Sequence, residues 1–183
     1  MSPILGIWAS QNYPRITNSY ESIATTTVGS GGSSTITFSS IPATFTHLQL
    51  RYIAQNTVAN YYVKMQFNSD TGTRYATHYL NGSGSAVSAS ASTSDTGLYL
   101  PRTNTSNFSA GVCDILDYTN TNKNKTVRSI GGFDANGSGY VDFNSGLWMP
   151  ASLGSGNITQ IDLILEAGNY AQYSQFALYG IKS

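Results

Sequence analysis

The residues from Asp134 to Ser145 have the spacing of a calcium-binding loop. Oxygen-bearing side chains occupy its first, third, fifth and ninth positions: Asp134, Asn136, Ser138 and Asp142. A glycine stands at the sixth position, as the sharp turn of such a loop requires. The twelfth position is Ser145 instead of a bidentate Glu, and Asx and Gly residues also form ordinary hairpin turns. The pattern therefore favours a plain turn and leaves calcium as the alternative.

Other residue types that could do chemistry are scattered. The two histidines, His47 and His78, lack the spacing of a metal site, and no serine lies in a nucleophile elbow. Asp114 and Asp117 would face opposite sides of a regular strand, and nothing in the sequence selects a pair of carboxylates to act across a sugar. We therefore expect a protein that is not an enzyme and that carries no cofactor.

Tyrosine is the unusual feature of the composition, with 13 residues among 183. Its rigid amphipathic ring suits both sugar-binding platforms and protein interfaces. Five tyrosines concentrate in the middle third of the chain: Tyr61, Tyr62, Tyr75, Tyr79 and Tyr99. They are predicted either as half-buried strand residues or as glycan or interface aromatics.

Charge is scarce, because only 10% of the residues are charged and the formal net charge is +0. Nucleic-acid binders usually carry a basic stripe, and here only Lys123, Lys125 and Arg128 cluster. No apolar run approaches the ~20 residues of a membrane span. Nucleic acid and membranes are therefore not expected partners. The single cysteine, Cys113, excludes an internal disulfide and is predicted to be a small buried hydrophobe.

The elements that must position these residues have strand periodicity. Residues 61–67 alternate most clearly, and residues 175–182 are apolar on both faces, which predicts a strand in the middle of a sheet. Residues 158–165 are predicted to pair with that last strand as a closing hairpin. Residues 81–97 are nearly all Gly, Ser, Ala and Thr, and indicate a mobile surface loop or a weak strand on a crowded interface.

Short strands separated by Gly, Ser and Asn turns predict an all-β protein, an antiparallel β-sandwich that is jelly-roll-like, over residues 21–183. Residues 1–20 are predicted to form an extended N-terminal segment, because this stretch is apolar at its start and broken by prolines. This segment either packs as a first strand on its own sandwich or acts as an arm that docks the module onto an assembly.

Three stretches resemble small virion proteins of tailed bacteriophages: residues 2–11, 38–51 and 176–182. They lie near both ends and in the middle, so the resemblance runs the whole length of the chain. It carries over no catalytic residues. It implies a β-sandwich module on the particle surface, commonly trimeric, that belongs either to the capsid decoration (cement) proteins or to tail and fibre components.

Within that resemblance, the short chain without a stalk favours a cement protein on the capsid exterior. Its implied partners are other copies of itself, in a trimer, and the major capsid protein or another virion protein. Five N-terminal residues would anchor it: Ile4, Leu5, Ile7, Trp8 and Tyr13. The alternatives are a tail adhesin that binds a host glycan and, outside the viral class, a free carbohydrate-binding module.

Overall fold

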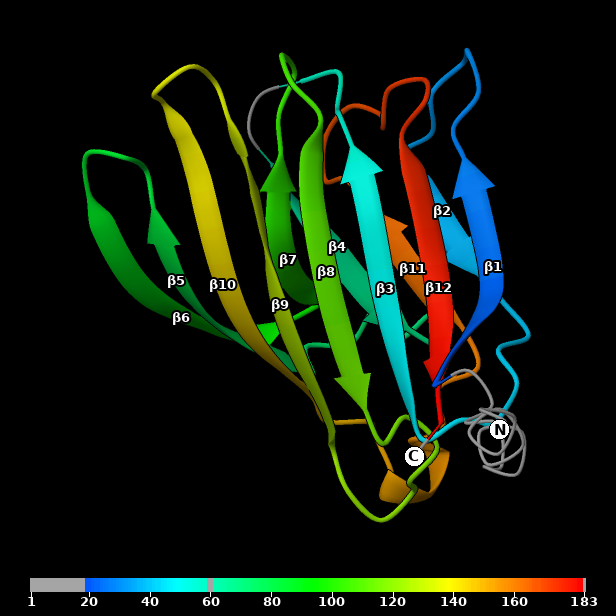
Figure 1. The fold of residues 1–183 in the computed structure, drawn as a ribbon. Helices are drawn as coiled ribbons and strands as arrows, with labels where there is room; N and C mark the ends of the chain where they lie inside the picture. The colour runs from blue at the N-terminus through cyan, green and yellow to red at the C-terminus, as the bar shows by residue number, and fades with distance from the viewer. Residues whose placement is uncertain (1–18, 59–60, 183) are drawn as a thin grey trace, which may run out of the picture.

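The computed structural model describes residues 19–58 and 61–182, which form two antiparallel sheets packed face to face (Figure 1). The larger sheet has eight strands, in the spatial order β1 (Tyr20–Thr27), β12 (Gln175–Ile181), β3 (His47–Ala54), β8 (Ser109–Leu116), β9 (Lys125–Asp134), β10 (Gly139–Trp148), β5 (Tyr75–Gly82) and β6 (Val87–Asp95). The smaller sheet has four strands, in the order β2 (Thr35–Phe38), β11 (Ile161–Ile164), β4 (Tyr61–Phe67) and β7 (Leu98–Thr103).

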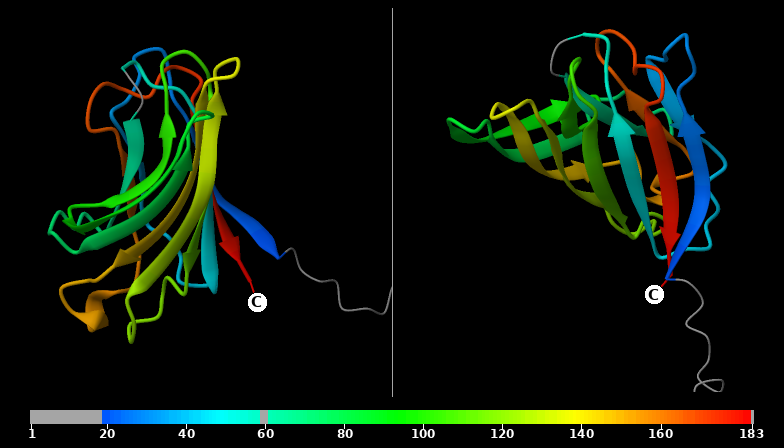
Figure 2. Two further views of the ribbon diagram at one scale, coloured as in Figure 1. Left: turned by 90° about the vertical axis from the view of Figure 1, so that its left-hand side faces the viewer. Right: turned by 45° about the horizontal axis from the view of Figure 1, so that its top comes forward.

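The path of the chain confirms the predicted jelly roll. Without β5, β6, β9 and β10, eight strands remain. Numbered along the chain, these eight pair in the orders 1-8-3-6 and 2-7-4-5, which is the winding of a jelly roll. The four additional strands extend the larger sheet beyond β8. We call β9, β10, β5 and β6 the wing, and Figure 2 shows it projecting to one side of the sandwich.

The sandwich interior is built from the alternation of its strands. On β4, the side chains of Val63, Met65 and Phe67 are fully buried, as their period of two predicts. The strand β12 lies between β1 and β3, which confirms its predicted place in mid-sheet. Its inward-facing Gly180 leaves room for the ring of Phe45, which would lie only 2.3 Å from an added Cβ.

The predicted closing hairpin is wrong. β11 pairs with β2 and β4 in the smaller sheet, whereas β12 belongs to the larger one. The intervening polar segment crosses between the sheets instead of turning back within one sheet. Both segments are apolar with the same period, so periodicity alone did not show which sheet each would join.

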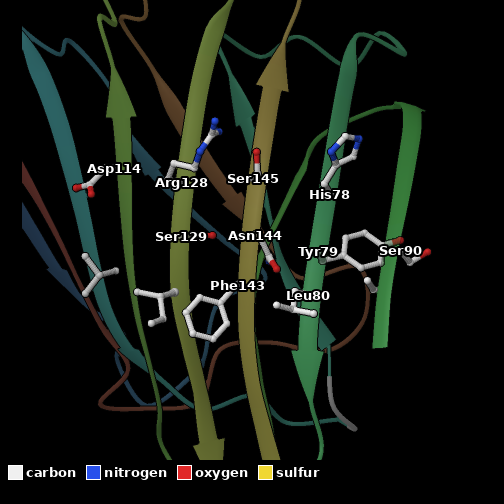
Figure 3. A pocket seen from close by; sticks show the side chains of 13 residues that line it. His78, Tyr79, Leu80, Ser90, Asp114, Arg128, Ser129, Phe143, Asn144 and Ser145 are labelled. Carbon is white, nitrogen blue, oxygen red and sulfur yellow. The ribbon is translucent and has the colours of Figure 1, made fainter. Parts of the chain in front are cut away.

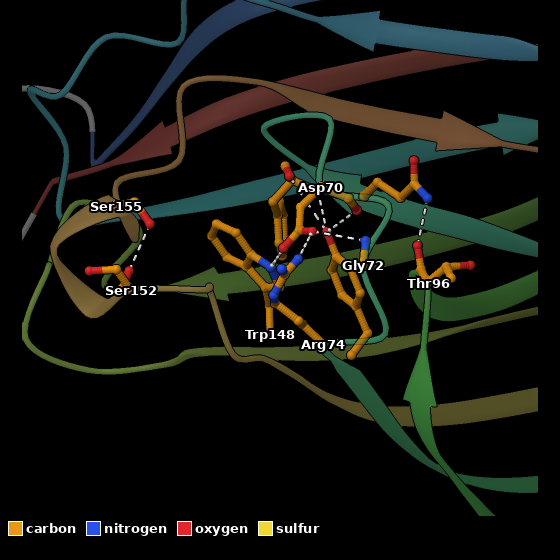
Figure 4. A network of polar contacts seen from close by, with 10 residues as sticks. Asp70, Gly72, Arg74, Thr96, Trp148, Ser152 and Ser155 are labelled. Carbon is orange, nitrogen blue, oxygen red and sulfur yellow. Dashed lines mark hydrogen bonds and ion pairs between the residues drawn. The ribbon is translucent and has the colours of Figure 1, made fainter.

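Polar contacts close one end of the sandwich, where the turn after β4 meets the end of β10 (Figure 4). The Asp70 carboxylate accepts hydrogen bonds from Trp148 Nε1 at 2.9 Å and from the Gly72 amide at 2.9 Å, and it pairs with Arg74. Tyr75 donates its hydroxyl to the Asp70 carbonyl at 3.0 Å. Within the described residues the only helical turn is η1 (Leu153–Ser155), so that part of the chain holds no helix able to cross a membrane.

The wing is attached to the edge strand β7 through polar side chains that point inward. The Tyr99 amide donates to Thr77 Oγ1 at 3.2 Å, and Asn144 Nδ2 donates to the Tyr99 carbonyl at 2.9 Å. The Arg102 amide donates to Asp142 Oδ2 at 3.0 Å. Backbone groups at the edge of the smaller sheet are therefore satisfied by the wing, as buried polar groups require.

Candidate interaction surface

The outer face of the wing and of the adjacent strand β8 carries a row of apolar side chains that crosses five strands. Strand register places these residues side by side, in the order Val112, Ile130, Phe143, Leu80 and Ala89. Ile130, Phe143 and Leu80 are each almost half exposed, at 48%, 48% and 47%. Large apolar side chains that lie together in this way mark a surface with a binding role more often than single exposed ones do.

A second row lies two residues further along the same five strands, continues onto β3, and is also apolar or small. Its members, in order of register, are Ile53, Ala110, Gly132, Val141, Gly82 and Val87. The exposed fractions of Ile53, Val141 and Val87 are 56%, 50% and 79%. The two rows together form one continuous apolar band, and none of their members is charged.

On the other side of the first row the surface is polar. Figure 3 shows Asp114, Arg128, Ser145 and His78 beside the apolar side chains. The Asp114 carboxylate accepts a hydrogen bond from Gln49 Nε2 at 2.7 Å, which fixes its position. The first row and this polar border line a shallow groove of about 710 Å³, which we call the apolar groove. An apolar centre with a polar rim is the usual anatomy of a protein interface.

The structure brings together three of the five tyrosines that the sequence predicts as glycan or interface aromatics. The ring of Tyr62 lies 5.9 Å from that of Tyr79 and 5.7 Å from that of Tyr99, between centroids. The Arg102 guanidinium lies 4.4 Å above the Tyr62 ring. All three tyrosines are half-buried, and they pack the wing strand β5 against β4 and β7.

The other two tyrosines belong to the interior. Tyr61 is partly buried against the core. Tyr75 is fully buried and stacks on Trp148 at 6.2 Å, so it is a core residue and is not available as a surface aromatic. The predicted anchors Ile4, Leu5, Ile7, Trp8 and Tyr13 lie outside the described residues.

The four predicted calcium ligands do not converge. Asp134 is the last residue of β9, and its Oδ1 accepts a hydrogen bond from the Gly137 amide of the following turn at 3.2 Å. Asp142 lies three residues beyond Gly139 on β10, a distance of about 10 Å along a strand. Its carboxylate is fully buried and is paired with Arg102. In the described part of the chain, no group of three or more His, Cys, Asp or Glu side chains could hold a metal ion.

A second, polar pocket of about 390 Å³ lies where three connections meet, β5–β6, β7–β8 and β9–β10. Its aromatic wall is formed by Phe133 and Tyr140, whose rings are 5.8 Å apart between centroids. Hydroxyl and amide side chains line most of the remainder: Ser83, Ser85, Asn104, Thr105, Ser106 and Ser138. An aromatic wall beside several hydroxyl and amide groups has the chemistry to hold a sugar.

Sequence reasoning did not single out Leu80, Ile130 or Phe143. The available signal was their alternation with polar residues, but the alternation does not say which side faces the core. Comparison of the chain with protein-family models, curated proteins and solved structures gives no match. The structure itself defines the class: a jelly-roll sandwich with a four-stranded wing whose outer face is apolar and exposed.

Proposed function

We propose that this chain is a structural protein of a tailed-phage virion, a capsid decoration protein that binds the capsid exterior and stabilises it. The main support for the proposal is the apolar groove, which has the exposed side chains of Ile130, Phe143 and Leu80 at its centre. Jelly rolls serve as viral capsid and lectin domains, but a fold alone does not assign a function. The groove supplies a surface that another virion protein, such as the major capsid protein, would cover.

The low charge of the chain supports the same role. A protein with a net charge of +0 can pack beside many copies of itself without long-range repulsion. The groove has one carboxylate and one guanidinium at its border, Asp114 and Arg128, which are register partners on β8 and β9. The proposal therefore attributes binding mainly to apolar contact and not to electrostatic steering of the partner protein. It assigns the chain no catalytic step.

Phe143→Asp is the variant that tests this role. The change places a charge at the centre of the groove, and we expect capsid affinity to fall by about thirtyfold or more, as for a central interface residue. The measurement is binding of the purified protein to expanded capsids, with Leu153→Asp as the matched control. Leu153 is 44% exposed on η1, outside the groove, so its replacement should leave binding unchanged. Equal binding by wild type and Phe143→Asp would refute the proposed surface.

The second candidate function is glycan binding, as a tail or fibre adhesin or as a free carbohydrate-binding module. The polar pocket beside Phe133 and Tyr140 favours it, because a sugar ring could stack on the aromatic wall while the surrounding side chains bond its hydroxyls. On a glycan array, wild type should then bind a defined set of sugars, and Phe133→Ala should lose most of that signal. Tyr173→Ala, at a tyrosine that is 69% exposed and lies outside the pocket, is the control. An array without any signal would remove this candidate.

A further inference from the structure

The two sheets have four edge strands, and three of them are protected against pairing with another chain. The strand β2 is only four residues long. The strand β1 has a bulge between Ser22 and Ala24. The edge of β7 is covered by side chains from the wing, as described above. Short length, bulges and covering are the devices by which natural sheets avoid association through their edges.

The fourth edge strand, β6, lacks these devices over most of its length. It spans Val87–Asp95, and within the described structure its backbone pairs only with β5. No Lys, Arg or Pro occurs in it, and its only charge is Asp95 at its end. The bulge in this ladder lies beside Tyr75 and Thr77, which leaves Val87–Ser92 in regular register. Within the described structure no second strand lies beside β6, so backbone donors and acceptors of Val87–Ser92 face outward along the sheet edge.

The sequence of β6 is complementary to itself. Its outer face carries Val87, Ala89 and Ala91, because these residues are the register partners of Gly82, Leu80 and His78 on the outer face of β5. The intervening residues on the inner face are Ser88, Ser90 and Ser92. When two such strands pair antiparallel, residues directly opposite each other point to the same side. Ala then lies opposite Ala, and Ser lies opposite Ser, with which it can form a hydrogen bond.

We infer that β6 is an assembly edge that pairs antiparallel with β6 of a second copy of this chain. A two-fold axis perpendicular to the sheet would join the two larger sheets into one. It would also place the two apolar bands side by side across the new contact, because Val87 and Ala89 belong to those bands. No charge on Val87–Ser92 opposes the contact. This inference depends on the free edge, and not on the proposed function.

The competing arrangement is β6 of one copy on β1 of the next, which is heterologous and forms a ring such as a trimer if its rotation closes, or an open filament if it does not. Two substitutions distinguish the β6–β6 arrangement from the β6–β1 arrangement. Ala91→Lys places like charges close together across a β6–β6 contact, and Thr25→Lys places the same charge on the exposed outer side of β1.

Sedimentation equilibrium of the full chain should show a concentration-dependent dimer. Ala91→Lys should weaken that dimer by about threefold to fivefold, since the two lysines become diagonal neighbours across the paired strands, where like charges repel, whereas Thr25→Lys should not change it. Circular dichroism serves to establish that both variants are folded. A protein that stays monomeric at all concentrations, or an assembly that Thr25→Lys disrupts as strongly as Ala91→Lys, would overturn the inference.

Cross-linking provides an independent measurement. Cys113, the single cysteine of the chain, is fully buried and should not react in the wild-type protein. In the pairing centred on Ser90, the variant Ser90→Cys brings two thiols opposite each other and should form an intermolecular disulfide in mild oxidant. Ser88→Cys and Ser92→Cys test the neighbouring registers, and Ser138→Cys in the exposed β9–β10 turn is the control. Cross-linking at Ser138 as fast as at every β6 position would contradict a specific contact.

Discussion

Replacing Asp142 with Ala is expected to lower the free energy of unfolding by about 3–5 kcal/mol, because removal of one partner leaves a buried charge without compensation. The Asp142 carboxylate is fully buried, and the side chain of Arg102 is only 12% exposed. Arg102 Nη2 lies 3.0 Å from Asp142 Oδ1, and Arg102 Nε donates to Asp142 Oδ2 at 3.1 Å. The backbone amide of Arg102 donates to the same oxygen, so the substitution also leaves an edge amide of β7 unpaired.

Urea unfolding at neutral pH measures this loss, and the surface ion pair between Glu21 and Lys182 provides the control. Those side chains are 53% and 44% exposed, so Glu21→Ala should cost no more than about 1 kcal/mol. In Asp142→Ala, the amides of Tyr99 and Arg102 should also exchange hydrogen faster than in wild type, because they are bonded to the wing. A loss below about 1 kcal/mol would show that Asp142 does not hold the wing to β7.

This attachment explains why one part of the structure was not predictable from sequence. On β10, Asp142 and Asn144 face the interior, whereas Val141 and Phe143 face outward. The usual assumption for alternating strands is the opposite arrangement, with apolar residues inside. Here the inner face meets the backbone edge of β7, which needs hydrogen-bond partners, so polar residues take the inner positions and the apolar ones form the surface.

The fold itself was largely predictable, because strand periods and turn residues are local properties. The jelly roll, the inward side of β4 and the place of β12 in mid-sheet all follow from such patterns. The apolar groove does not follow from them, since Leu80, Ile130 and Phe143 are far apart in the sequence and meet only through the register of the wing. The assembly edge lies in residues 81–97, where small side chains left both a loop and a weak strand open.

Stability is expected to fall steeply above about pH 10. Burial raises the pKa of Tyr52, Tyr75 and Tyr170 well above the ordinary tyrosine value, and burial likewise raises the pKa of the Cys113 thiol. These groups ionise more readily in the unfolded chain, so the stability that they provide is complete below their unfolded pKa and is lost as the pH rises toward the folded pKa. Each group removes about 1.4 kcal/mol per pH unit in that range, and the four together remove about 5 kcal/mol per unit.

Lys125 acts in the opposite direction only below its unfolded pKa of about 10.4, because burial lowers the pKa of its ammonium group. Above that pH both the folded and the unfolded chain have lost this proton, so Lys125 does not offset the loss from the four groups. A domain with a stability of order 10 kcal/mol would then unfold within about two or three pH units above pH 10. Urea unfolding at about pH 8, 10 and 11 measures the slope, and absorbance of tyrosinate follows ionisation in the same samples. A midpoint in urea that does not change between pH 8 and 11 would contradict the expectation.

Tyr170→Phe isolates the contribution of one buried hydroxyl. That hydroxyl has no hydrogen-bond partner among the described residues, and the ring of Tyr170 packs edge-on against Phe176 at 4.8 Å. Its removal should therefore keep the packing, change stability at neutral pH by no more than about 1 kcal/mol, and reduce the alkaline slope by about 1.4 kcal/mol per pH unit.

Tyr52→Phe is the matched comparison, because the Tyr52 hydroxyl donates to the Pro101 carbonyl at 2.6 Å. It should reduce the slope equally but also cost about 0.5–1.5 kcal/mol at neutral pH. If Tyr170→Phe had the same alkaline slope as wild type, ionisation of buried tyrosine would not be the cause of the alkaline transition.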